Sequence, residues 1–143
     1  MFNSILVVCV GNICRSPTGE RILQVLLKNK KIDSAGIAAV VGHDADKTAS
    51  LVAEEHGISL SNHVAKQITK ELCHQNDLIL VMEKKHIELV CKIAPEVRGK
   101  IMLFGHWDGG FEISDPYRQS KESFSFVYEK LYESATQWAK KIG

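Results

Sequence analysis

The fold of this chain is decided by the segment ILVVCVGNICRSP, residues 5–17. Its first part, residues 5–10, is a continuous apolar run rich in β-branched side chains, which is typical of a parallel strand buried on both faces. The glycine and asparagine that follow end the run, because both tolerate backbone angles that strands do not use. Ser16 is a good N-cap and Pro17 a good first helical residue. A helix is therefore expected from about residue 17 to residue 28.

Strands alternate with helices in the rest of the 143 residues. That alternation indicates βαβ units, in which a parallel sheet carries helices on both faces. We therefore predict a single α/β domain over residues 1–143, with a four-stranded parallel sheet and a phosphate-binding loop after the first strand. The further strands are expected at residues 31–35, 77–82 and 100–104, and the further helices at residues 47–56, 83–94 and 120–142.

The loop after the first strand has the pattern C-x5-R-S, from Cys9 to Ser16. Ligands of open parallel sheets bind outside the carboxyl ends of the strands, which is where Cys9 falls. A loop wrapped between a strand end and a helix start points several backbone N–H groups inward and forms an anion-binding nest. The expected phosphate-binding residues are Val10, Gly11, Asn12, Ile13, Cys14, Arg15 and Ser16.

Two side chains of this loop suit phosphoryl transfer. The planar fork of Arg15 can grip two phosphate oxygens. The positive field of loop and helix favours the thiolate of Cys9, which can attack phosphorus. The alternative is a plain buried strand cysteine beside a solvated arginine. Ser16 has two roles open to it, as helix cap or as hydrogen-bond donor to the Cys9 sulfur, and Asn12 is expected to hold a left-handed turn.

A tyrosine oxygen that leaves phosphorus needs a proton, and a loop carboxylic acid is the usual donor. Asp115-Pro116-Tyr117 provides the best candidate. Pro116 restricts the backbone of Asp115 to extended conformations, and Tyr117 can stack on a substrate ring. An ordinary turn aspartate is the competing interpretation. Other carboxylic acids that could donate this proton are Asp108, Glu112, Asp44 and Asp46.

Composition and sequence patterns exclude several other classes of function. Lys plus Arg total 18 against 17 Asp plus Glu, a formal charge of +1, so charge alone draws the chain neither to nucleic acid nor to a membrane. Residues 1–4 carry no basic charge and the apolar run after them is too short for a signal core, so a cytoplasmic location is expected. No C-x-x-C or H-E-x-x-H pattern occurs, and no metal or cofactor is expected. Glu83-x-x-His86 has metal-ligand spacing, but a surface role is favoured, whereas His63 is a candidate support for the loop.

The quoted motifs resemble those of the low-molecular-weight protein tyrosine phosphatases. Residues 8–20 look like the family's phosphate-loop signature and residues 115–117 like its general-acid motif, and the resemblance covers nearly the whole chain. It implies Cys9 as nucleophile, Arg15 as phosphate clamp, Asp115 as general acid and Tyr117 on the pocket wall. Further matches lie at residues 34–36, 63–67 and 78–83.

Residues 82–88 and 102–108 look closest to the bacterial Wzb-like branch, which is tied to capsule and exopolysaccharide export. The resemblance implies a phosphotyrosine protein as partner, a membrane tyrosine autokinase, and a monomeric or weakly oligomeric enzyme. Glu83 departs from the aspartate that is common in the wider family. The loop 38–46 lacks the aromatic wall of many relatives, so ring selectivity is expected to rest on Tyr117, Ile13, Ala39 and Val40.

Cysteine positions carry the remaining expectations. The family often has a second cysteine like Cys14, five residues after Cys9, and a reversible disulfide between the two is expected under peroxide. The alternative is that Cys14 only packs beneath the loop.

Two other functions compete with the phosphatase. A thioredoxin-coupled arsenate reductase of the same fold needs two further cysteines on one short helical segment. Cys73 and Cys91 are eighteen residues apart, on what look like different elements. A phosphopeptide-binding module would have no use for a reactive cysteine beside a proton donor.

Overall fold

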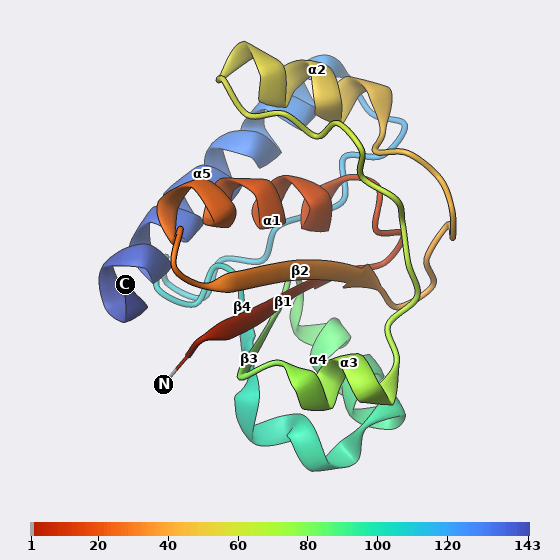
Figure 1. Cartoon of the computed structure of the whole chain (residues 1–143). Coiled ribbons are helices and arrows are strands. Elements are labelled where there is room, and N and C mark those ends of the chain that lie inside the picture. Colours follow the sequence, from red (N-terminus) through yellow and green to blue (C-terminus); the bar gives the residue numbers. More distant parts are fainter. Residues whose placement is uncertain (1) are drawn as a thin grey trace.

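Four parallel strands form the centre of the computed structural model, which describes residues 2–143 (Figure 1). Their order across the sheet is β2-β1-β3-β4. In the register, Cys9 lies opposite Gly36 of β2 and Val8 opposite Val81 of β3. The four-stranded parallel sheet predicted from the sequence is thus confirmed. The strands are β1 (Ser4–Cys9), β2 (Lys31–Gly36), β3 (Leu78–Val81) and β4 (Ile101–Leu103).

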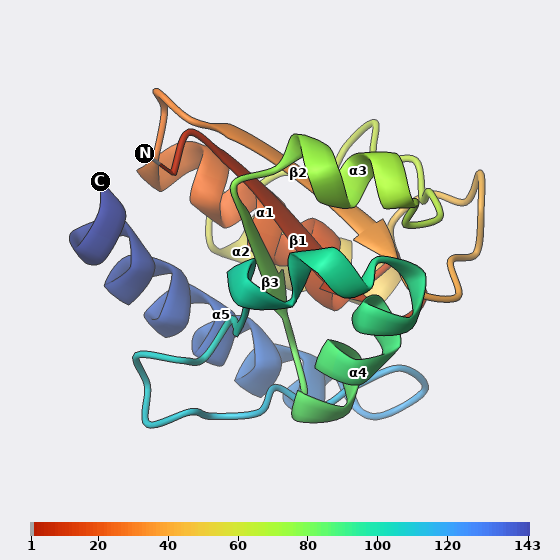
Figure 2. The same cartoon turned by 90° about the horizontal axis from the view of Figure 1, so that it is seen from below.

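Helices cover both faces of the sheet, as expected. Three of them lie on one face and two lie on the other, together with a short 3-10 helix (Figures 1 and 2). The first group comprises α1 (Arg15–Leu26), α2 (Lys47–Glu55) and α5 (Lys121–Ile142); the second comprises α3 (Lys70–Gln75), α4 (Lys84–Ile93) and η1 (Pro95–Lys100).

The helices α3 and η1 are absent from the sequence-based prediction. Each has six residues, which is less than two turns of an α-helix. Such a segment is too short to show a helical period in its apolar residues.

The alternation of side chains along β1 divides the core between the two faces. Ile5 and Val7 pack with α1, α2 and α5, whereas Leu6 and Val8 pack with α3, α4 and η1. None of these four side chains is exposed at all. A strand buried on both faces was the first expectation from the sequence, and it holds because helices from both groups cover β1.

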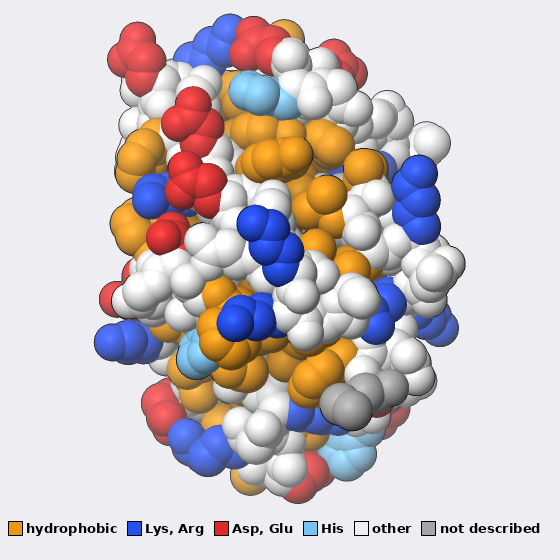
Figure 3. Space-filling model, turned by 90° about the vertical axis from the view of Figure 1, so that its left-hand side faces the viewer, with side chains coloured by type: hydrophobic (Ala, Val, Ile, Leu, Met, Phe, Trp, Pro, Cys, Tyr) orange, Lys and Arg blue, Asp and Glu red, His pale blue; other side chains and the backbone are white. Residues whose placement is uncertain are grey.

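The surface shows no dominant charge sign on the face drawn in Figure 3. Acidic and basic side chains both occur there, with apolar side chains between them. This matches a formal charge of +1. Within residues 2–143, no helix is long and apolar enough to span a membrane.

The start of α1 differs from the prediction. The helix begins at Arg15 with Cys14 at the N-cap position, and no side chain caps it. Ser16 is therefore not the N-cap, and Pro17 is not the first helical residue. The phosphate-loop geometry explains the shift, because the side chain of Ser16 turns back toward Cys9 instead of toward the helix.

The pair Glu83 and His86 begins α4. The ring Nδ1 of His86 accepts a hydrogen bond of 3.2 Å from the Glu83 backbone N–H. His86 is completely buried, so its expected surface role is wrong. It shares the core-facing side of α4 with Val90, four residues later, and helical neighbours at that spacing lie on one face. Within residues 2–143 no group of three potential ligands is placed to hold a metal ion.

Burial, reinforced by the charge of Arg15, holds the pKa of His86 below its ordinary value of 6.5. Glu83, Lys85 and Glu112 also act on the ring. Below about pH 6.5 the unfolded chain binds a proton that the folded chain does not, so stability falls with falling pH. We predict that His86→Gln, whose amide oxygen can still accept from Glu83, loses less stability between about pH 7 and pH 5.5. The difference is at most about 1.4 kcal/mol per pH unit.

Urea unfolding across this pH range measures the effect. His43 is exposed, and His43→Gln is the matched control with the same change of side chain. Equal pH slopes for His86→Gln and the unsubstituted protein would show that His86 is protonated in the folded state.

Candidate active site

The sulfur of Cys9 lies at the carboxyl end of β1, beneath the loop that leads into α1. Only 2% of the residue is exposed. The backbone N–H of Ser16 donates to the sulfur at 3.4 Å, and the Ser16 hydroxyl oxygen lies 2.9 Å from it. The loop therefore closes around the sulfur and presents two hydrogen-bonding groups of one residue to it.

Asn12 holds the loop closed. It has a φ of 56°, the left-handed conformation that the sequence predicts, and it is completely buried. Its side-chain amide donates to the hydroxyl oxygens of Ser16 (2.8 Å) and Ser34 (3.0 Å), and its side-chain oxygen accepts from the Lys66 backbone N–H (2.9 Å). Because Ser16 accepts from Asn12, its own hydrogen is free to point at the Cys9 sulfur.

Three residues support Asn12 from other elements. His63 bonds the Asn12 carbonyl oxygen through its Nε2 at 2.6 Å, as its suggested supporting role requires. The Ser34 hydroxyl donates to the buried carboxylate of Glu20. Sequence reasoning assigned no role in the site to Ser34 or to Glu20, whose charge was expected only to favour the first turn of the helix. Two signals were available: Ser34 lies near the carboxyl end of the neighbouring strand, and Glu20 lies one helical turn after Ser16.

The backbone of the loop leaves its N–H groups free. Its carbonyl oxygens are bonded by the following loop, since those of Cys9, Val10, Gly11 and Ile13 accept from residues 37–46. By contrast, the N–H groups of residues 11–14 donate to no group within residues 2–143. Unbonded N–H groups at a helix N-terminus are the donors that an anion requires.

Arg15 is held from one side. Its Nη1 donates to the carboxylate of Glu83 at 2.6 Å and to the backbone oxygen of Ile113 at 2.8 Å. Its Nη2 lies 3.8 Å from the carboxylate of Asp115. Only 2% of Arg15 is exposed, so these contacts fix the guanidinium with one edge directed at the pocket.

Glu83 is the partner of Arg15 that sequence reasoning missed, since Glu83 was considered for its metal-ligand spacing with His86 and as a departure from the family pattern, but not as an ion-pair partner. Partial burial raises the pKa of its carboxyl group, but the hydrogen bond and charge of Arg15 outweigh burial and hold the pKa below its ordinary value. Glu83 is therefore a carboxylate at neutral pH and balances the buried charge of Arg15.

Cys9 and Arg15 line a pocket of about 220 Å³. The pocket is also lined by Ile13, Val40 and Tyr117, as the sequence predicts. Ala38 lines it in place of the expected Ala39. Ala39 instead faces Gly36, where an added Cβ would lie 3.0 Å from the Ala39 methyl group. Of the expected phosphate-binding residues, Asn12 and Ser16 do not line the pocket. The remaining five do, namely Val10, Gly11, Ile13, Cys14 and Arg15.

Asp115 is the one carboxylate, among the described residues, that lines this pocket. Its Oδ1 accepts from the Tyr117 backbone N–H at 3.0 Å, and its side chain is 46% exposed. The competing acids are engaged elsewhere. Asp108 pairs with Lys130, Glu112 accepts from the Lys84 N–H, Asp46 caps α2, and Asp44 lines a separate hollow beside α2.

The four cysteines fall into two groups. Cys9 and Cys14 are both buried free thiols that line the pocket. Burial, together with negative charge at Cys9, Asp115 and Asp46, holds the pKa of Cys14 well above its ordinary value. Cys73 and Cys91 lie on α3 and α4, in the core of the other face of the sheet. Neither of these two lines the described pocket, and they lie on different helices, whereas an arsenate reductase requires two further cysteines on one short helical segment.

Comparison with known proteins agrees with this geometry. The family model for low molecular weight phosphotyrosine protein phosphatases matches residues 4–143. The chain is 62% identical to the probable low molecular weight protein-tyrosine-phosphatase AmsI of Erwinia amylovora, over 96% of each chain. It is 60% identical to the low molecular weight protein-tyrosine-phosphatase Wzb of Escherichia coli K12, over 99% of this chain and 97% of that one.

A solved structure shows the same fold. Vibrio vulnificus Wzb, in complex with benzylphosphonate, superimposes with a TM-score of 0.98 at 57% identity, covering 99% of this chain and 100% of that one. The likeness therefore extends over the whole sheet and all of its loops, and it favours the phosphatase over the arsenate reductase. The chain belongs to the low molecular weight phosphotyrosine protein phosphatase family.

Proposed function

We propose that this enzyme hydrolyses phosphotyrosine in two steps, with Cys9 as the nucleophile. In the first step the Cys9 thiolate attacks phosphorus, and the sulfur–phosphorus bond forms as the phosphorus–oxygen bond to tyrosine breaks. The tyrosine oxygen leaves with the bonding electron pair and takes a proton from Asp115. In the second step Asp115 takes a proton from water, whose oxygen attacks phosphorus and releases Cys9 as thiolate and phosphate as product.

One observation carries this proposal: the Cys9 sulfur, the free loop N–H groups, Arg15 and Asp115 meet at a single pocket. The N–H groups and the free edge of Arg15 stabilise the charge on the equatorial oxygens of the transferring group. The Ser16 hydroxyl, 2.9 Å from the sulfur, stabilises the thiolate when it departs in the second step.

The pocket suits an aromatic phosphate. Tyr117 is 45% exposed at its rim and can stack on a ring, with Val40 and Ile13 supplying apolar walls. The complex of Vibrio vulnificus Wzb with benzylphosphonate supports this assignment, since that ligand carries a phenyl ring beside its phosphonate group.

The proposed physiological substrate is a membrane tyrosine autokinase of capsule or exopolysaccharide export, reached from the cytoplasm by a single-domain enzyme that is a monomer or a weak oligomer. Support comes from the resemblance of residues 82–88 and 102–108 to the Wzb-like branch and from the identity to Wzb and AmsI.

The nucleophile is tested by Cys9→Ser. We expect a folded protein whose kcat for an aryl phosphate falls by at least about a thousandfold, because a serine hydroxyl is not ionised in this loop. Arg15→Lys is expected to lose about 10²–10³-fold, since an ammonium group cannot make two parallel hydrogen bonds to phosphate. Substantial turnover by the folded serine variant, measured as phosphate release, would rule out Cys9.

The proton donor is tested by Asp115→Asn. Turnover of phosphotyrosine should fall by about 10²–10⁴-fold, because its departing oxygen is strongly basic. Aryl phosphates whose leaving group is already stable as an anion should suffer far less. The basic limb of the pH–rate profile should also disappear, because it reports the loss of the acid's proton.

Asp108→Asn is the matched control for that experiment, since Asp108 lies outside the pocket and pairs with Lys130 at 3.4 Å. If the loss of turnover depends on the leaving group in Asp108→Asn but not in Asp115→Asn, then Asp108 is the proton donor and the assignment of Asp115 is wrong.

We also propose that Cys14 protects Cys9 during oxidation. Peroxide converts the Cys9 thiol to a sulfenic acid, and the Cys14 sulfur then displaces water to form a disulfide that an added thiol reduces. Activity should return after peroxide and thiol treatment in the unsubstituted enzyme and much less in Cys14→Ser. Cys73→Ser, at the other face of the sheet, is the control, and equal recovery in all three proteins would leave Cys14 with a packing role only.

A further inference from the structure

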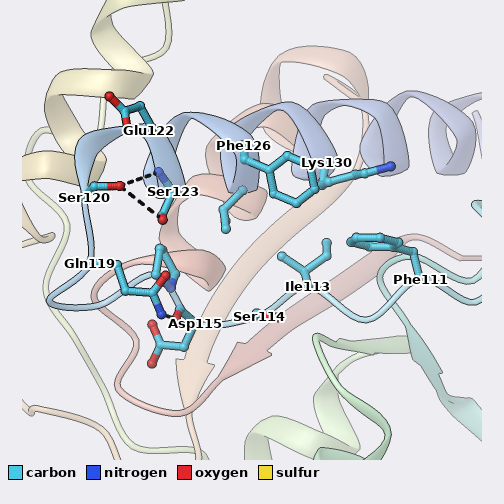
Figure 4. Close-up of a pocket in the computed structure, with 12 residues that line it drawn as sticks. Phe111, Ile113, Ser114, Asp115, Gln119, Ser120, Glu122, Ser123, Phe126 and Lys130 are labelled. Atoms are coloured by element: carbon cyan, nitrogen blue, oxygen red, sulfur yellow. Dashed lines mark hydrogen bonds between the residues drawn. The ribbon is translucent and has the colours of Figure 1, made fainter.

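A second hollow, of about 450 Å³, lies beside the proposed active-site pocket and shares Asp115 with it. It is formed between the loop that follows β4 and the N-terminal half of α5 (Figure 4). No role has been given to it by the chemistry described above. Its lining consists of Phe111, Ile113, Ser114, Asp115, Pro116, Gln119, Ser120, Glu122, Ser123, Phe126, Val127 and Lys130.

One part of the hollow is apolar. Ile113 and Val127 are buried beneath it, with 1% and 7% exposure. The rings of Phe111 and Phe126 meet edge to face, with centroids 6.4 Å apart. Phe126 remains 53% exposed, so it keeps a large apolar surface in water that a bound group would cover.

The part nearer Asp115 is polar, and its side chains apart from Asp115 and Glu122 are uncharged. Figure 4 shows Gln119, Ser120 and Ser123 toward one end of the hollow, with Phe126 farther along α5 and Phe111 at the other end. The Gln119 amide donates to the backbone oxygen of Asp115 at 3.1 Å, and the Ser123 N–H donates to Ser120 Oγ at 3.3 Å. Groups of this kind can also exchange hydrogen bonds with a peptide backbone.

The charges of the hollow do not suit a second anion. Lys130 is the one cation among its lining residues, and it already pairs with Asp108 at 3.4 Å and Glu133 at 3.5 Å. Its ammonium also lies 4.4 Å from the centroid of the Phe111 ring. Glu122 adds a negative charge to the lining. An uncharged apolar group is the occupant that the lining favours.

We propose that this hollow binds an apolar side chain of the substrate protein, within three residues of the phosphotyrosine. The inference rests on the proposed function, which places the phosphotyrosine oxygen against Asp115. An extended peptide advances by about 3.3–3.6 Å per residue, so three residues span roughly 10 Å. A chain that runs from Asp115 toward α5 therefore passes over the hollow that Asp115 itself lines, and its side chains can point into it.

The test uses phosphotyrosine peptides of equal length, in which one leucine replaces alanine at each position from three before to three after the phosphotyrosine. We expect leucine at one or two of these positions to raise kcat/KM by about tenfold, the order found when an apolar pocket gains or loses part of a side chain. Phe126→Ala should remove that preference. Tyr132→Ala should keep it, because Tyr132 is similarly exposed on α5 (46%) but lies outside the hollow.

A second variant fills the hollow instead of opening it. Ser123→Phe places a ring beside Phe126, one helical turn earlier on α5, and should also abolish the leucine preference. Turnover of a small aryl phosphate is measured in parallel, because it depends on the active-site pocket and not on the second hollow. A failure of the proposed function would abolish both reactions in the unsubstituted enzyme, whereas a failure of this inference leaves both intact with no leucine preference.

Three outcomes would overturn the inference: equal kcat/KM for all peptides, a leucine preference that survives both Phe126→Ala and Ser123→Phe, or a hollow occupied by a second copy of the chain. Sedimentation of the unsubstituted enzyme and Phe126→Ala detects the last, as a dimer that the substitution dissociates while peptide selectivity is unchanged.

Discussion

The left-handed turn at Asn12 is the constraint on which the site depends. It leaves the N–H groups of residues 11–14 without a partner among residues 2–143, and a backbone N–H group that stays unbonded in the folded chain costs free energy. The surrounding structure offsets that cost, because the Asn12 side chain bonds Ser16, Ser34 and the Lys66 backbone while the loop carbonyls bond residues 37–46. The donors are thus aligned for an anion before one arrives, as electrostatic catalysis requires.

The parallel sheet brings the remaining groups to the same edge. Cys9 ends β1, Glu83 lies just beyond β3, and Asp115 belongs to the loop that follows β4. Arg15 joins them, since one nitrogen of its guanidinium bonds both Glu83 and the Ile113 backbone. Arg15, the proposed phosphate clamp, is therefore tied to the segments that follow β3 and β4 as well as to the loop after β1, which carries the proposed nucleophile, and its free edge has a fixed direction.

Features that depend on one continuous stretch of sequence could be predicted. The buried strand, the loop that follows it and the placing of Cys9 and Arg15 all lie within residues 5–17. Contacts between distant segments were harder: the Glu83–Arg15 pair joins residues 68 apart, and Ser34 reaches Asn12 from another strand. Ala39 was named for the pocket wall where its neighbour Ala38 lines the pocket, because the sequence does not show which side chains of the turn after β2 point inward. His86 was placed at the surface although it is buried, because one metal-ligand spacing does not reveal which side of a helix faces the core.

The most direct test of the central claim is to trap the covalent intermediate. Enzyme and phosphotyrosine substrate are mixed, quenched with acid within the first turnover, digested, and mapped by mass spectrometry. We predict phosphate on Cys9, appearing before free phosphate and then decaying. Two results would contradict the claim that this loop holds a phosphocysteine. One is phosphate on another residue, and the other is turnover without any phosphoenzyme and with inversion at a chiral phosphorus.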